Sequence, residues 1–204
     1  MHSLKNMIEF YNINSAKPYQ LFKKKYDDAI MSEQKDIEAI CISSYSESNK
    51  EVNARYVNLK KIINKNFIFF SNYESQKAKD FSEHKQITAL IFWNSINIQI
   101  RMKAVIKKTS KEFNDKYFSQ RSTDKNALAL SSKQSKKIDS FDLVKLNYKD
   151  SMENDDLKKC PDYWGGYLFQ PFYFEFWEGH SSRLNKREVY ELINTDWVNY
   201  FLQP

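Results

Sequence analysis

The chain has 204 residues, of which 41% are hydrophobic and 16% aromatic, and a formal net charge of +6, so it can bury one substantial core. Only three glycines occur, Gly165, Gly166 and Gly179, which excludes the glycine-rich phosphate loops of dinucleotide-binding and Walker-type proteins. Three dispersed histidines and two distant cysteines have no metal-ligand spacing, so we expect no metal site and reduced thiols.

The positive charge is distributed among acidic residues rather than gathered in a stripe. Lysines stand beside Asp and Glu in the segments FKKKYDD, KDIEAI and KEFNDK, which is typical of mixed, solvated faces. The N-terminal segment lacks the apolar core of a secretory signal, and no apolar run is long enough to span a bilayer. We therefore expect a cytoplasmic protein with no nucleic-acid partner and no membrane partner.

The first half of the chain predicts one helix followed by strands. Pro18 can open a helix in which Phe22, Tyr26 and Ile30 form one apolar stripe. Short runs rich in β-branched and aromatic residues follow, separated by polar turns. These runs are 38–45, 53–61, 66–72 and 86–93. Between 96 and 103, Ile and Met alternate with polar residues, which indicates an antiparallel strand with one buried face.

The second half begins with helices and ends with strands. From Ser110, a candidate N-cap, the apolar spacing is helical up to Arg121, and 124–150 predict one or two further polar helices. A loop over 151–164 precedes four more strands. They are expected near 166–169, 172–177, 188–193 and 197–202. Two groups of strands separated by helices favour a mostly antiparallel barrel or sandwich with peripheral helices.

Four polar clusters stand near the ends of these elements. They are RYVNLK at 55–60, FFSNYESQK at 69–77, YFSQR at 117–121, and Trp177 with Arg183 and Arg187. The second cluster opens a helix with hydroxyls and a lysine, a setting that can bind phosphate without glycines. In the third, a tyrosine and an arginine four residues apart can hold an anion together. Each cluster also has an ordinary interpretation as a helix cap, an edge-strand residue or a surface pair.

Taken in order, these clusters resemble the pyridoxamine 5′-phosphate oxidase family, also called the pyridoxine 5′-phosphate oxidases. The segments that carry the resemblance are RYVNLK, FFSNYESQK, IQI, YFSQR, KQS, WGGY, FEFWEG and RLNKR, and the match runs from about Lys17 to the C-terminal FLQP. It implies a mainly β fold with peripheral helices, the six-stranded antiparallel FMN-binding split β-barrel. It further implies a homodimer in which two FMN sites are shared between the subunits.

The resemblance implies a single domain over 1–204, with a C-terminal dimerisation and active-site region at about 164–204. We expect 1–16 to be mobile. The residues implied to bind FMN are Arg55, Tyr56, Val57, Asn58, Leu59, Lys60, Phe70, Ser71, Ser75, Gln76, Lys77, Gln99, Gln134, Ser135, Trp177 and Arg187. Five of them are expected to reach the flavin from the partner subunit: Gln99, Gln134, Ser135, Trp177 and Arg187. The residues implied to bind substrate are Lys60, Tyr117, Arg121, Lys125, Arg183 and Asn185. The last two are the implied catalytic residues: Arg183 is expected over the carbon that is oxidised, and Asn185 stands at the position of a substrate-contacting histidine.

The implied reaction oxidises pyridoxine 5′-phosphate or pyridoxamine 5′-phosphate to pyridoxal 5′-phosphate, with dioxygen reduced to hydrogen peroxide. The sequence departs from the family pattern in four places: Asn185 replaces a histidine, Gln76 an arginine and Lys125 a serine, and LALS at 128–131 stands where the family has IGAW. Two alternatives stay open. One is a related oxidase of the phenazine-biosynthesis type, whose members share the SQK triplet, and the other is a non-catalytic protein that binds FMN or pyridoxal phosphate. The preferred vitamer, alcohol or amine, is also open.

Overall fold

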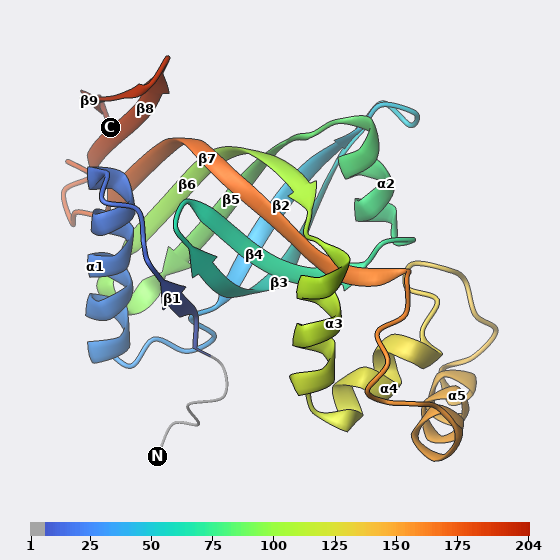
Figure 1. Cartoon of the computed structure of the whole chain (residues 1–204). Coiled ribbons are helices and arrows are strands. Elements are labelled where there is room, and N and C mark those ends of the chain that lie inside the picture. Colours follow the sequence, from blue (N-terminus) through green and yellow to red (C-terminus); the bar gives the residue numbers. More distant parts are fainter. Residues whose placement is uncertain (1–6) are drawn as a thin grey trace.

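Six antiparallel strands close into a barrel in the computed structural model, which describes residues 7–204 (Figure 1). The strands are β2 (Ala39–Ser46), β3 (Glu51–Ile63), β4 (Asn66–Asn72), β5 (Gln86–Trp93), β6 (Ile98–Lys108) and β7 (Trp164–Glu178). The pairing runs β3–β2–β5–β6–β7–β4 and returns to β3, so the ring has no free edge. The predicted six-stranded antiparallel split barrel is confirmed.

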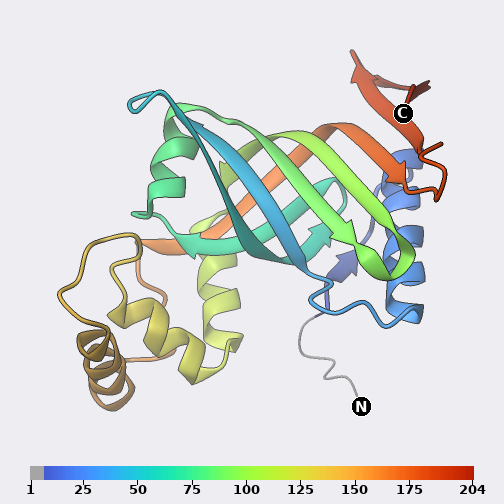
Figure 2. The same ribbon diagram turned by 180° about the vertical axis from the view of Figure 1, so that it is seen from behind.

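The remaining elements surround this ring. The helices are α1 (Lys17–Met31), α2 (Gln76–Glu83), α3 (Lys111–Gln120), α4 (Thr123–Ser131) and α5 (Phe141–Asn154), with a short 3₁₀ turn, η2 (Asn94–Ile96). Strand β1 (Glu9–Tyr11) pairs in parallel with β3, and β8 (Lys186–Ile193) and β9 (Asp196–Leu202) extend the sheet beyond β7. Figures 1 and 2 show α3, α4 and α5 at one end of β7, and α1 with the C-terminal hairpin at the other.

The barrel interior is filled by alternate side chains of its strands, both aliphatic and aromatic. Ile98, Ile100, Met102 and Ala104 of β6 are buried while the residues between them are partly exposed, as the alternation predicts. From α1, Phe22 enters this core and packs edge-on against a strand phenylalanine, with ring centroids 5.1 Å apart. Truncating such a fully buried ring to Ala costs about 3–5 kcal/mol of stability, so α1 is an integral part of the core.

Most predicted elements are present, with two corrections. The runs expected near 166–169 and 172–177 form one continuous strand, β7, because a register shift opposite Lys103 and Ala104 accommodates Pro171, which cannot donate a ladder hydrogen bond. The loop expected from 151 begins later, since α5 continues to Asn154. Cys160 and Cys41 are free thiols.

Two further expectations concern the N-terminal region and membranes. Residues 1–6 of the segment expected to be mobile lie outside the described residues, whereas Glu9–Tyr11 form β1. No helix within 7–204 combines the length and the apolar character needed to cross a bilayer.

A close contact between β7 and α3 determines where the polar cluster on α3 lies. A Cβ added at Gly165 would lie 2.2 Å from Tyr73 Oη and 2.3 Å from Asn114 Nδ2, so only glycine permits this approach. Asn114 accepts a hydrogen bond from the Gly166 amide at 2.9 Å. These contacts fix α3 beside the end of β4, with Tyr117 over Phe70.

Candidate active site

One large cleft gathers most of the predicted site residues. It has a volume of about 1270 Å³ and lies between the middle of β3, the end of β4, the first turn of α2 and the α3–α4 region, with β1 at its rim. The predicted residues that line it are Arg55, Tyr56, Val57, Asn58, Lys60, Phe70, Ser71, Gln76, Lys77, Tyr117, Arg121, Lys125, Gln134 and Ser135. Sites for single small ligands commonly span about 300–1,000 Å³, so this cleft has room for two.

Lys77, in the first turn of α2, carries a buried ammonium group with neutral partners. It donates hydrogen bonds to Ser71 Oγ at 2.9 Å and to Ser75 Oγ and Gln134 Oε1 at 3.3 Å each. Within residues 7–204 it forms no ion pair, and burial, together with the nearby Arg55, lowers the pKa of Lys77 to about 8. A desolvated cation without a carboxylate beside it is suited to an anionic ligand.

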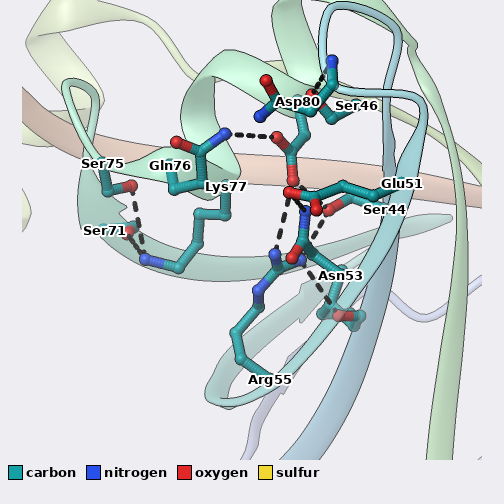
Figure 3. Close-up of polar contacts among 12 residues, drawn as sticks. Ser44, Ser46, Glu51, Asn53, Arg55, Ser71, Ser75, Gln76, Lys77 and Asp80 are labelled. Atoms are coloured by element: carbon teal, nitrogen blue, oxygen red, sulfur yellow. Dashed lines mark hydrogen bonds and ion pairs between the residues drawn. The ribbon is translucent and has the colours of Figure 1, made fainter. Parts of the chain in front are cut away.

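Arg55 of β3 is the second cation at this end of the cleft, and polar groups from β2 and α2 fix its position (Figure 3). Its guanidinium donates to Ser44 Oγ at 2.6 Å and to the Ile42 carbonyl at 3.3 Å. It also pairs with the fully buried carboxylate of Asp80 at 3.4 Å. Gln76 donates its amide to the same carboxylate at 3.1 Å.

A second group of cations, Lys60, Arg121 and Lys125, lines the cleft where β3 faces the α3–α4 connection. Burial lowers the pKa of Lys60; Glu38, whose Oε1 lies 3.6 Å from Lys60 Nζ, opposes this shift, and Lys125 and Arg121 add to it. Burial also lowers the pKa of Arg121. Glu38 offsets one of these three charges, and an anion bound between the cations would balance the remaining excess of positive charge.

Aromatic rings form the wall beside this second group. Tyr117 stacks on Phe70 with ring centroids 3.6 Å apart, and the Trp164 ring lies nearly parallel to Phe70 with a centroid distance of 5.2 Å. The Arg121 guanidinium lies 4.5 Å from the Trp164 ring and receives a fixed orientation from Asn126 Oδ1, to which it donates at 3.0 Å. Flat rings beside fixed cations can hold a planar ligand that carries a phosphate.

Gln134 and Ser135 were expected to reach the flavin of the partner subunit, and the structure places both in the cleft of their own chain. Gln134 Oε1 accepts hydrogen bonds from Ser71 and Lys77, because the segment after α4 turns back over the end of β4. Two other predicted residues lie behind the cleft wall. Leu59 and Ser75 have fully buried side chains and do not line the cleft, although residues next to them in the sequence do.

Gln99, Trp177 and Arg187 lie together, away from this cleft. They are register partners across β6, β7 and β8, so their side chains share one face of the sheet. Trp164, at the start of β7, lines the cleft; Trp177 is 177 − 164 = 13 residues further, roughly 40 Å along an extended strand. Figure 1 shows the C-terminal hairpin at this distant end of β7.

The turn between β7 and β8 carries Arg183 and Asn185, also away from the cleft. Arg183 has a positive φ of 61° and is exposed, while its backbone N–H donates to the His180 carbonyl at 3.0 Å. Asn185 Oδ1 accepts from the His180 backbone N–H at 3.0 Å and closes the turn. An amide at this position therefore has a structural function in the turn.

Several lining residues were not found from the sequence. Glu9 and Tyr11 of β1, together with Lys61, stand at the rim, where Lys61 pairs with Glu9 at 2.7 Å. Trp164 was noted only within the WGGY segment. Asp80, which lies behind the cleft and does not line it, was missed as well, although its spacing of four residues from Gln76 on a helix is a usable signal.

Comparison with known families gives two matches that together cover most of the chain. The family model described as "Pyridoxamine 5′-phosphate oxidase" matches residues 26–151. The one described as "Pyridoxine 5′-phosphate oxidase C-terminal dimerisation region" matches residues 164–204.

Relatives and solved structures agree with these matches. The chain is 30% identical over 190 residues to a "Pyridoxine/pyridoxamine 5′-phosphate oxidase" of Leptospira interrogans, covering 92% of this chain and 88% of the relative. It is 32% identical over 194 residues to one of Colwellia psychrerythraea, covering 94% and 88%. The structure of PhzG from Burkholderia lata 383, in complex with tetrahydrophenazine-1-carboxylic acid, superposes with a TM-score of 0.86 at 24% identity over 92% of both chains. A pyridoxamine 5′-phosphate oxidase-related FMN-binding protein from Nostoc punctiforme superposes with a TM-score of 0.72 at 11% identity, covering 93% of this chain and 99% of that one.

Proposed function

The chain belongs to the pyridoxamine 5′-phosphate oxidase family, and we propose that it is an FMN-dependent oxidase of B6 vitamers. It converts pyridoxine 5′-phosphate, or pyridoxamine 5′-phosphate with water, into pyridoxal 5′-phosphate in the cytoplasm. Dioxygen is reduced to hydrogen peroxide, and the amine substrate also releases ammonia. The observation that carries this proposal is the presence of two separate groups of cations in one cleft of about 1270 Å³, each with a lysine whose pKa is lowered by burial.

The first group fits the phosphate of FMN. Lys77 is buried without a carboxylate beside it, and Arg55 is held by three oxygens, so both cations are ordered before a ligand binds. Ser71 and Gln134 add polar groups for the phosphate and the ribityl chain. The edge of β3 from Tyr56 to Asn58, together with Phe70, offers backbone and ring contacts to the isoalloxazine. When bound, FMN supplies the acceptor for two electrons from the substrate and their transfer to dioxygen.

The second group fits the phosphate of the substrate. Lys60, Arg121 and Lys125 supply positive charge, and Tyr117 supplies a hydroxyl at the end of a stacked ring. Arg121 is oriented by Asn126, so the phosphate is held at a defined place in the cleft. Positioning of this kind lowers the barrier by holding the reacting carbon in a productive place, which accounts for several kcal/mol in many enzymes.

The remaining site residues come from a second copy of the chain. The face that carries Gln99, Trp177 and Arg187 belongs to the region that matches the dimerisation family, apart from Gln99 on the neighbouring β6. In a homodimer with shared sites, this face and the turn with Arg183 and Asn185 meet the cleft of the partner. Arg183 then lies over the substrate carbon that is oxidised.

Two positions, Gln76 and Asn185, favour a second function, the oxidation of a larger ring system of the phenazine type. Gln76 stands where the family has an arginine and binds Asp80, and Asn185 replaces a histidine. The cations of the second group favour the B6 vitamer. Glu38 offsets the charge of Lys60 alone, so a substrate without phosphate leaves the charges of Arg121 and Lys125 in the cleft unbalanced.

The test begins with the absorbance spectrum of the purified protein after addition of FMN. We expect a yellow complex that bleaches under anaerobic conditions on addition of pyridoxine 5′-phosphate or pyridoxamine 5′-phosphate and that produces peroxide in air. Unphosphorylated pyridoxine is the matched control and should react far more slowly. A yellow protein that ignores both vitamers but oxidises a dihydrophenazine acid would support the second function. A yellow protein that oxidises neither class would indicate a carrier, and failure to bind FMN would exclude the flavin proposal.

A further inference from the structure

A buried carboxylate stands behind the phosphate end of the cleft without lining it. Asp80, on α2, is fully buried, and every contact it makes is with a hydrogen-bond donor. Its Oδ1 accepts from Gln76 Nε2 at 3.1 Å. Its Oδ2 accepts from Ser44 Oγ at 2.6 Å and from Arg55 at 3.4 Å. Figure 3 shows these side chains converging from β2, β3 and α2.

Ser44 connects this carboxylate to the cation that faces the cleft. The Ser44 hydroxyl donates to Asp80 and accepts from Arg55, with both distances 2.6 Å, so its single proton has a fixed direction. Three N–H groups of Arg55 are thus used by Ser44, the Ile42 carbonyl and Asp80. A guanidinium has five, which leaves two for a ligand in the cleft that Arg55 lines.

We propose that Asp80, acting directly and through Ser44, is the positioning residue that fixes Arg55 for the phosphate of the bound flavin. This inference rests on the proposed function, because it requires that FMN bind at this end of the cleft. An arginine side chain has many rotamers, and ordering it during binding reduces affinity. Asp80 orders it beforehand, and its own charge is offset by the guanidinium that it holds.

The donors around Asp80 allow its charge and its geometry to be separated. In Asp80→Asn, the new amide can keep the Ser44 bond through its oxygen. Gln76 can turn its own amide so that its oxygen accepts from the new NH2 group. This variant therefore removes the charge and keeps the network. Asp80→Ala removes both, and Ser44→Ala removes the bridging hydroxyl alone.

The experiment measures the dissociation constants of FMN and riboflavin for each variant. Riboflavin lacks the phosphate, so the ratio of the two constants reports only the phosphate contacts. We expect Asp80→Ala to weaken FMN binding at least about tenfold, and Ser44→Ala about fivefold, because each removes hydrogen bonds to a charged group. Asp80→Asn should weaken it by about threefold or less, and riboflavin binding should change by less than about twofold throughout. Glu83→Gln, an exposed change on the same helix, is the matched control.

The possible results separate this inference from the function on which it rests. Equal losses for FMN and riboflavin in Asp80→Ala and Ser44→Ala would show a purely structural role and overturn the inference. Tighter FMN binding in Asp80→Asn would overturn it too, since Asp80 would then act by repelling the phosphate. If wild-type protein binds riboflavin as tightly as FMN, or binds neither, the proposed phosphate site fails before any variant is compared. If Asp80→Ala does not fold, Ser44→Ala and Asp80→Asn decide the matter.

Discussion

The buried charge of Lys77 is unfavourable for the stability of the flavin-free protein but favourable for binding an anionic ligand. Its ammonium is almost fully buried among neutral oxygens, and burial together with Arg55 lowers its pKa to about 8. The charged form needs an anion nearby, and in the flavin-free protein no carboxylate within residues 7–204 forms an ion pair with it. Its hydrogen bonds hold Ser71 and Gln134 in place until a ligand arrives.

This depressed pKa predicts how FMN affinity depends on pH. As pH rises through about 8, Lys77 loses its proton in the free protein, so the affinity for FMN should fall between pH 8 and 10. Lys77→Arg, which stays charged throughout, should show a flatter profile of FMN affinity against pH in the same fluorescence titration.

The stability of the flavin-free protein should change in the opposite direction. Because the unfolded state binds more protons between pH 8 and 10.5, the free energy of unfolding rises over that window. A wild-type profile of FMN affinity against pH as flat as that of Lys77→Arg would contradict the assignment of the lowered pKa to Lys77.

At the scale of elements, the connection between α3 and α4 determines where the substrate cations lie. Asn126 is fully buried there and donates to the carbonyls of Phe118 at 2.9 Å and Leu157 at 2.7 Å. Its oxygen accepts from Arg121 at 3.0 Å. One side chain thus joins the end of α3, the start of α4, the segment after α5 and the guanidinium in the cleft.

We expect Asn126→Ala to reduce the free energy of unfolding by about 2–3 kcal/mol, since it removes three hydrogen bonds made by a fully buried side chain. It should raise KM for the phosphorylated substrate severalfold while FMN affinity stays within about twofold, because the flavin cations lie on other elements. Denaturant unfolding and steady-state kinetics measure the two effects. Asn154→Ala, at the exposed end of α5, is the control. Unchanged KM in a destabilised variant would limit Asn126 to a structural role.

Local pattern predicted the strands and helices but not the contacts between them. The alternation in β6 and the Ser110 cap correspond directly to observed features, because each depends on neighbouring residues alone. The continuous β7 was missed, since a bulge at Pro171 depends on its partner strand. Strand β1 has three residues and no period to detect. Asp80 resembled a solvated helix charge, and only the fold shows that it is buried.

The sequence also predicted only some of the residues that line the cleft. Motifs placed Arg55, Lys77 and Arg121 correctly in one cleft, although the sequence alone allowed each an ordinary surface role. The position of Gln134 in the cleft of its own chain was not predicted, because nothing in the KQS segment shows that the chain turns back after α4. The direction of a chain reversal is set by tertiary packing, which single-sequence patterns do not contain.

At the scale of the whole molecule, the predicted site residues lie in two separate places, the cleft and the C-terminal hairpin, so the proposed function predicts that a second subunit completes each site. Gln99, Trp177 and Arg187 form one row, and Arg187 pairs with the buried Glu175, which also holds Arg101. Exposed apolar side chains on the outside of the barrel, including Val52, Tyr56 and Phe92, are suited to burial between subunits.

A mixed dimer tests this arrangement. Lys77→Met damages the cleft, and Arg187→Met damages the row on β8, so each homodimer should have both sites impaired and little oxidase activity. If the two subunits are co-expressed with different tags and the mixed dimer is purified, one site carries both changes and the other carries neither. That dimer should have about half the wild-type activity, because closed twofold symmetry gives two sites per pair. If each chain used its own Arg187, both sites of the mixed dimer would be impaired and the activity would stay at the background of the parents. The same preparation, titrated with FMN, should bind one flavin tightly per dimer, which locates the intact site independently of turnover.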